Sequence, residues 1–254
     1  MNEVKIYLMR VDQMDLSDKR YWECVSKERR AKAQRIRTQD GQRLSLGAGI
    51  LLEYAVRAWD PEYVGEVQTR ENEFGKPEVV RDRELLCNGD GLEERVGSKA
   101  GNMCISLTHS GSVAGCAVAD VEVGLDIEKI KGYDGRVARR FFRDEEWKFV
   151  EEKAQEDRGG AFCEQWVLKE SFVKAVGMGF HLPIEEFAIH RGEKIWVEQA
   201  AVDGEFAFRL ERLDQEYQMA VCTKGVAQIS VIWGGIIFEE TKELIDGRDR
   251  NKQN

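Results

Sequence analysis

Apolar residues between Gln42 and Trp59 recur at the spacing of one helix face, whereas residues 1–8 alternate like a short strand. The same patterns along the chain predict helices over 17–37, 42–59, 144–154 and 162–176. They predict strands over 4–9, 103–107, 113–118, 121–128, 187–190, 195–198, 206–210, 219–223 and 229–233. Each half of the chain is therefore expected to hold two helices followed by several strands.

Turn-forming residues indicate where these elements end. Pro61 stops the second helix, and Gly177 and Gly179, with Pro183 beyond them, end the last one. Polar, glycine-rich sequence over 86–101 predicts a loop. Because each half then holds helices followed by strands, we predict an N-terminal half over 1–120, a C-terminal half over 121–238 and a polar tail over 239–254.

The composition, with 42% hydrophobic and 33% charged residues, is that of a soluble globular protein. No apolar run approaches the ~20 residues that cross a bilayer, so no membrane partner is expected. The N-terminus lacks the apolar core of a signal peptide, and the six cysteines are scattered without a CxxC pair. These features predict a cytoplasmic protein with reduced thiols.

A net charge of −9 argues against nucleic acid as a partner. Basic residues nevertheless outnumber acidic ones between Asp18 and Arg43. This stretch is either a solvated helix face or a landing site for phosphates or an acidic partner, and composition leaves both interpretations open.

The strand predicted over 121–128 carries two carboxylates on one face. Alternate strand residues share a face, so Leu125 and Ile127 point into the core while Gly124, Asp126 and Glu128 point the other way. Asp126 and Glu128 can then share a cation, and Gly124 is expected to leave room for a ligand. The alternative is the ordinary solvent-facing side of a half-buried strand.

One face of the helix over 162–176 carries Trp166, Glu170 and Lys174 at intervals of four residues. Glu170 is a candidate third metal carboxylate and a candidate base, and Lys174 is a candidate partner for a phosphate oxygen. Alternatively, the two form an exposed ion pair that adds about 0.3 kcal/mol.

Two turn-like segments offer further polar groups. Thr108-His109-Ser110-Gly111, predicted as a loop between strands, presents hydroxyls and an imidazole that suit a phosphate. The turn Gly75-Lys76-Pro77 projects one cation. The glycine-rich nucleotide loops, the HExxH zinc motif and the GxSxG elbow are missing from the sequence.

The order of these motifs resembles the Sfp-type 4′-phosphopantetheinyl transferase family. The motifs that carry the resemblance are Gly75-Lys76-Pro77, Ile105-Ser106-Leu107-Thr108-His109-Ser110-Gly111, Val123-Gly124-Leu125-Asp126-Ile127-Glu128 and Trp166-x-x-Lys169-Glu170-Ser171-x-x-Lys174. The similarity extends over roughly residues 1–225. It implies an α+β pseudo-dimer of two similar halves, active as a monomer, with the active site in the cleft between them.

The resemblance also implies the reaction. The family transfers the 4′-phosphopantetheine arm of coenzyme A to a serine of an apo acyl or peptidyl carrier protein and releases adenosine 3′,5′-bisphosphate. The nucleophile belongs to the carrier, which accounts for the lack of a distinctive catalytic serine in this chain. Fatty-acid, polyketide and nonribosomal-peptide carriers all stay open as substrates.

Matching residue by residue, Asp126, Glu128 and Glu170 correspond to the family's magnesium carboxylates, with Mn²⁺ as an alternative metal. Lys174 corresponds to the lysine on the pyrophosphate, and Glu170 is also a candidate base for the incoming serine. Lys76 and His109 correspond to positions that contact phosphate or nucleotide, and Thr108 corresponds to a hydroxyl in the same segment. Arg43 and the basic helix around Lys27 and Arg30 correspond to the region that holds the 3′-phosphate, and which of these side chains does so stays open. Ser106 and Thr108 depart from the Asn and Ser that are usual in the family.

Two other functions are compatible with these motifs. One is a binder of coenzyme A or carrier protein that has lost catalysis, although such a protein would typically lack one of the carboxylates or Lys174. The other is a Mg²⁺-dependent hydrolase of phosphate esters, which would release phosphopantetheine from coenzyme A without a carrier.

Overall fold

The computed structural model describes residues 1–63, 65–80 and 103–234. The loop predicted over 86–101 and the tail predicted over 239–254 lie outside the described residues. Within the described residues, no helix is both long and apolar enough to cross a bilayer.

The elements of the first half are β1 (Asn2–Arg10), α1 (Lys19–Glu23), α2 (Lys27–Gln34), α3 (Gln39–Trp59), β2 (Thr69–Glu71), β3 (Pro77–Val79), β4 (Cys104–Ser110) and β5 (Val113–Ala119). Those that follow are β6 (Val123–Lys129), α4 (Gly135–Phe141), α5 (Asp144–Glu151), α6 (Arg158–Val176), η2 (Gly179–His181), η3 (Ile184–Glu186), β7 (Ala188–His190), β8 (Trp196–Glu198), β9 (Phe206–Arg212), β10 (Tyr217–Lys224) and β11 (Ala227–Trp233). The fold is mixed α+β, as the sequence predicts.

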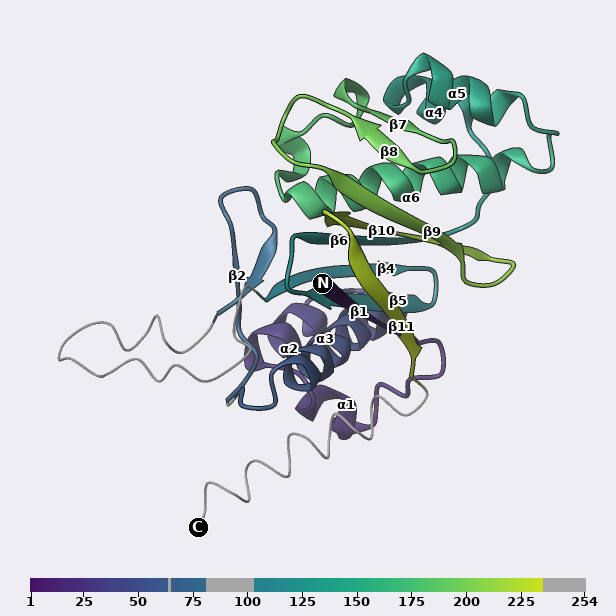
Figure 1. Ribbon diagram of the computed structural model, residues 1–254. Helices are drawn as coiled ribbons and strands as arrows, with labels where there is room; N and C mark the ends of the chain where they lie inside the picture. Colours follow the sequence, from purple (N-terminus) through teal and green to yellow (C-terminus); the bar gives the residue numbers. More distant parts are fainter. Residues whose placement is uncertain (64, 81–102, 235–254) are drawn as a thin grey trace, which may run out of the picture.

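Two sheets form the centre of the molecule, one with strand order β11-β1-β5-β4 and one with order β6-β10-β9. Their inner faces share one buried core, whose members include Ile6, Leu8, Leu125, Ile127 and Met219. The long helix α3 covers the outer face of the first sheet, and α6 covers the outer face of the second (Figure 1). Each half thus backs a sheet with one long helix.

Several local features differ from the sequence predictions. Thr108, His109 and Ser110 lie in β4 and not in a loop. The basic helix expected over 17–37 is divided into α1 and α2, because Ser26 caps a new helix through its side chain. Helix α6 begins at Arg158, four residues before the predicted start at 162, and includes Gly159 and Gly160. Strand β11, which the predicted boundaries place in the second half, pairs in parallel with β1 of the first sheet.

Gly177 ends α6 in the left-handed conformation, with φ of 77°, which confirms the predicted helix end. Gly124 has a different role from the one we expected. A Cβ atom at Gly124 would lie 1.9 Å from the Ser171 carbonyl oxygen and 2.3 Å from the Ala175 nitrogen. The missing side chain therefore admits the backbone of α6, and the expectation that it leaves room for a ligand is wrong.

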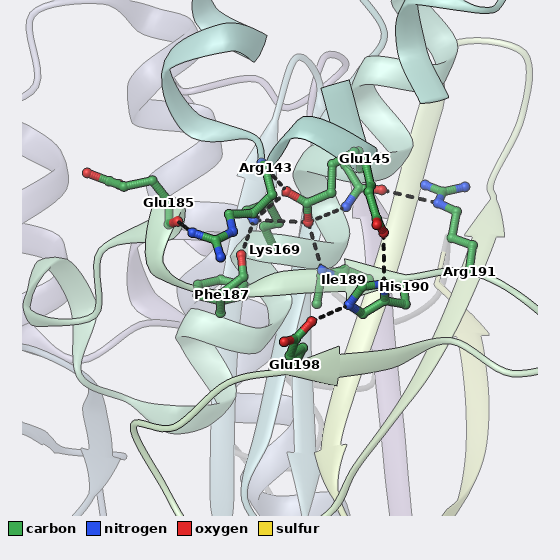
Figure 2. A network of polar contacts seen from close by, with 11 residues as sticks. Arg143, Glu145, Lys169, Glu185, Phe187, Ile189, His190, Arg191 and Glu198 are labelled. Atoms are coloured by element: carbon green, nitrogen blue, oxygen red, sulfur yellow. Dashed lines mark hydrogen bonds and ion pairs between the residues drawn. The ribbon is translucent and has the colours of Figure 1, made fainter. Parts of the chain in front are cut away.

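A buried ion pair fixes α6 against α5 and the β7 strand. Lys169 Nζ lies 2.7 Å from Glu146 Oε2 and 3.0 Å from Oε1, and it also donates to the Phe187 carbonyl oxygen at 2.7 Å. Figure 2 shows Lys169 in this network, with Arg143, Phe187 and Ile189 around it. Burial lowers the pKa of Lys169, and the charge of Glu146 opposes that shift. The helix that carries Glu170 and Lys174 is therefore anchored from its opposite side.

Candidate active site

A cavity of about 860 Å³ lies between the two halves of the chain. The first half contributes Ser26, Arg29, Lys32, Gly75, Pro77, Thr108 and His109 to its lining, among others. The second half contributes Asp126, Glu128, Trp166, Glu170 and Lys174. The structure therefore brings together most of the residues that the motifs single out, from segments far apart in the sequence.

Asp126 is a buried carboxylate of the cavity, with 4% of the residue exposed. Its Oδ1 accepts from Lys174 Nζ at 2.6 Å and from Thr108 Oγ1 at 3.2 Å. Its Oδ2 is buried and has no hydrogen-bond partner among the described residues. Burial raises the pKa of Asp126, and the ammonium of Lys174 partly offsets this. A buried carboxylate oxygen without a donor indicates a site that a ligand completes.

Glu128 and Glu170 lie beside Asp126. Glu128 Oε2 accepts from Ser110 Oγ at 2.6 Å. Burial raises the pKa of Glu170, and the negative charges of Asp126 and Glu128 raise it further. The three carboxylates are thus close enough to repel one another, which favours a cation among them.

The donor set suits a hard divalent metal ion. Within the described residues, no three His, Cys, Asp or Glu side chains are gathered closely enough to hold a metal as they stand. The orphaned Oδ2 of Asp126 and the raised pKa values of Asp126 and Glu170 nevertheless fit an all-oxygen site. In this arrangement the ammonium of Lys174 supplies the positive charge beside Asp126.

Lys76, a predicted coenzyme A contact, does not line this cavity. Its Nζ donates to the carbonyl oxygens of Val123 at 3.2 Å and Ala175 at 2.9 Å. Burial lowers its pKa. Lys76 thereby ties the β2–β3 hairpin to β6 and to the end of α6, while its neighbours Gly75 and Pro77 line the cavity.

Helix α2 presents different basic residues to the cavity from those that the sequence singles out. Arg30 Nε donates to the Trp22 carbonyl at 2.8 Å, and Arg43 Nε donates to the Met14 carbonyl at 2.9 Å. Lys27 is exposed. Among the described basic residues of this region, Arg29 and Lys32 line the cavity instead.

A second cavity of about 810 Å³ adjoins the first, and Trp166, Glu170 and Lys174 line both. Most of its remaining lining is apolar and includes Phe74, Phe141, Phe180, Leu182, Pro183 and Ile184. The phenyl ring of Phe180 is fully exposed. Glu170 and Lys174 therefore stand where a polar cavity meets an apolar one.

Residues 122–222, which run from β6 into β10, match the model of the 4′-phosphopantetheinyl transferase superfamily. The chain is 29% identical over 170 residues to 4′-phosphopantetheinyl transferase gsp of Aneurinibacillus migulanus, a match that covers 66% of this chain and 63% of that protein. It is 26% identical over 224 residues to 4′-phosphopantetheinyl transferase Sfp of Bacillus subtilis strain 168, covering 86% of this chain and 92% of Sfp. The chain is thus similar to 4′-phosphopantetheinyl transferases over most of its length, and to the superfamily model over residues 122–222.

These similarities confirm the resemblance, the enzyme class and the fold class predicted from the sequence. The roles of individual residues stay predictions. Arg29 and Lys32 were missed because the sequence does not indicate which face of the basic helix lies against the cavity. The two residues lie three apart and share one face of α2, and which face lies against the cavity is set by tertiary packing.

Proposed function

We propose that this chain transfers the 4′-phosphopantetheine arm of coenzyme A to a serine of an apo acyl or peptidyl carrier protein and releases adenosine 3′,5′-bisphosphate. The observation that carries the proposal is the unpartnered, buried oxygen of Asp126 in a cavity that also holds Glu128, Glu170, Lys174 and cationic side chains of α2.

Arg29 and Lys32 are our candidates for the 3′-phosphate of coenzyme A. Both line the cavity on the side opposite α6, and a guanidinium binds phosphate oxygens through paired N–H groups. Burial lowers the pKa of Arg29, so a bound phosphate would return an opposite charge to a guanidinium that has lost water.

Asp126, Glu128 and Glu170 would hold the metal, Mg²⁺ or Mn²⁺, which on binding would offset the charge that develops on the pyrophosphate. Lys174 Nζ would then be released from Asp126 to donate to a phosphate oxygen of the leaving group. A cation placed where negative charge grows lowers the barrier because the site is already ordered.

Glu170 is our candidate acceptor for the proton of the carrier's serine hydroxyl. Burial and the two neighbouring carboxylates raise its pKa, which makes its carboxylate a stronger base. Its position between the two cavities lets it face a serine that enters from the apolar side.

The carrier would approach over the apolar cavity beside Glu170, which gives a protein partner a surface of exposed and half-buried rings. The basic stretch from 18 to 43 stays a second predicted docking surface, attractive to an acidic carrier. Activity as a monomer and a cytoplasmic location also stay predictions.

Labelling a panel of apo acyl and peptidyl carriers with a fluorescent coenzyme A analogue tests the proposal. We expect transfer with Mg²⁺, none with a chelator, and strong loss in Asp126→Asn but not in Asp203→Asn, an exposed carboxylate outside the cavity lining. Absence of labelling across the panel, or equal activity of the two variants, would contradict it. Release of phosphopantetheine from coenzyme A without a carrier would favour the hydrolase.

A further inference from the structure

Three hydroxyl side chains on β4 join the two sheets along one seam. Ser106, Thr108 and Ser110 alternate along the strand and therefore share a face. Their Oγ atoms accept the backbone N–H groups of three alternate residues of β6, Leu125 at 2.9 Å, Ile127 at 3.2 Å and Lys129 at 3.0 Å. Strands β4 and β6 are edge strands of different sheets. The hydroxyls of β4 therefore bind backbone N–H groups of β6 that have no neighbouring strand of their own sheet on that side.

Two of the three hydroxyls also hold a carboxylate. Thr108 Oγ1 donates to Asp126 Oδ1 at 3.2 Å, and Ser110 Oγ donates to Glu128 Oε2 at 2.6 Å. In each case the carboxylate residue directly precedes the residue whose N–H donates to the same hydroxyl. Asp126 precedes Ile127, and Glu128 precedes Lys129. At Ser106 the corresponding residue is Gly124, which has no side chain to hold.

The direction of these bonds follows from the chemistry of a hydroxyl. Each has one proton and can accept through its lone pairs, so an oxygen that accepts a backbone N–H is left to donate its proton to the carboxylate. Thr108 and Ser110 are both at least nine-tenths buried, which removes water as a competing partner.

We propose that Thr108 and Ser110 are positioning residues that orient the Asp126 and Glu128 carboxylates toward a divalent cation, an inference that rests on the proposed function. Thr108 and Lys174 both hold Oδ1 of Asp126, so Oδ2 is the oxygen turned to the ligand. This role differs from the phosphate contact that the family resemblance implies for Thr108. The single hydroxyl proton of Thr108 already donates to Asp126 and is not available to a phosphate.

The chain supplies its own matched control. Ser106→Ala removes a seam bond without touching a carboxylate, whereas Thr108→Val and Ser110→Ala remove a seam bond and a carboxylate donor together. The measurements are Mn²⁺ binding to the full chain by electron paramagnetic resonance, Mg²⁺ dependence of transfer, and unfolding in urea.

We expect all three variants to lose stability to a similar extent, and Ser106→Ala to bind Mn²⁺ within about 2-fold of the wild-type affinity. Thr108→Val and Ser110→Ala should weaken Mn²⁺ binding about 10- to 100-fold, as loss of a partner of a metal ligand typically does. Thr108→Ser, which keeps the hydroxyl, should restore the affinity. In transfer, the two variants should need more Mg²⁺ and recover rate when it is raised.

Equal Mn²⁺ affinity in Ser106→Ala, Thr108→Val and Ser110→Ala would overturn the inference. If Thr108→Val does not fold, Ser110→Ala and Thr108→Ser decide it in the same way. Wild-type protein that labels carriers but does not bind Mn²⁺ would overturn the inference and leave the transferase activity standing. Wild-type protein that does neither would overturn the proposed function itself.

Discussion

Helix α6 carries two lysine–carboxylate pairs, one at Lys169 and one at Lys174, whose closest N–O distances are nearly equal, at 2.7 Å to Glu146 and 2.6 Å to Asp126. The carboxylate oxygens of the first pair are fully used. Glu146 accepts from Lys169, from the Gln165 side chain and from the backbone N–H groups of Arg143 and Ile189.

The second pair is left open. Asp126 has one oxygen without a donor, and the Lys174 side chain is 30% exposed where that of Lys169 is 0%. A saturated buried network specifies one structure, whereas an unsatisfied one costs free energy unless a ligand completes it. The same pairing of residue types therefore anchors the helix on one face and prepares a site on the other.

The largest expected effect is a loss of stability when the fully hydrogen-bonded pair of Lys169 and Glu146 is broken. Lys169→Met leaves the buried charge of Glu146 without its cation, so we expect the free energy of unfolding to fall by about 3–5 kcal/mol. Urea unfolding measures this. The double variant Glu146→Gln with Lys169→Met removes both charges and should recover part of the loss. A loss below about 1 kcal/mol in the single variant would mean that the pair does not anchor α6.

At the pair of Lys174 and Asp126 we expect a substitution to reduce activity but not stability. Asp126→Asn should reduce transfer about 100- to 1,000-fold, because a group that stabilises charge in the reaction is lost. Its free energy of unfolding should not fall, since burial raises the pKa of Asp126 and its charge therefore opposes folding at neutral pH. A variant that loses stability and keeps its activity would reverse the assignment of the two pairs.

A third pair, Glu53 with Arg57 on α3, sharpens the comparison through pH. Glu53 Oε2 lies 2.6 Å from Arg57 Nη1, yet burial raises the pKa of Glu53 to about 7 from an ordinary 4.5. Since the folded state holds this proton more tightly than the unfolded chain, the free energy of unfolding should fall as pH rises from about 4.5 to 7 and then level off.

The expected fall at Glu53 is roughly 2–3 kcal/mol. Glu53→Gln carries no charge at any pH, so its urea-unfolding profile should be flatter than that of the wild type over this range. Loss of the contact to Arg57 would lower the whole profile without changing its slope. Parallel profiles for the two proteins would show that Glu53 is ionised in the folded state at pH 5.

The smallest effect concerns two neighbouring arginines of α2. Arg29→Ala should raise the KM for coenzyme A about 10-fold, since a charge-assisted bond to phosphate contributes about 1.5 kcal/mol. The increase should vanish with 3′-dephospho-coenzyme A, which lacks the phosphate. Arg30→Ala, whose guanidinium donates to the Trp22 carbonyl, serves as the control and should change KM little. The opposite ranking would restore Arg30 as the phosphate ligand.

The sequence predicted what depends on local periodicity and on motif order. Strand alternation correctly placed Asp126 and Glu128 on one face, and helix spacing placed Glu170 beside Lys174. The cavity brings all four together.

Partners chosen by tertiary packing could not be predicted. The carbonyls that hold Lys76 come from β6 and α6, and the carboxylate that holds Lys169 comes from α5. Nothing in the spacing of either lysine indicates these partners. Whether Arg29 or Arg30 faces the cavity depends on how α2 packs against its neighbours, which its own periodicity does not reveal.

Strand β11 pairs in parallel with β1 along a register that runs from Asn2 opposite Ala227 to Leu8 opposite Trp233. Because β1 is synthesised before β11, their sheet cannot be completed until β11 has also been synthesised. Every residue that lines the main cavity is synthesised between these two events. Although the chain resembles two units in tandem, its N-terminal sheet cannot be completed as synthesis proceeds, and both halves should reach their final structure together, after translation has passed Trp233.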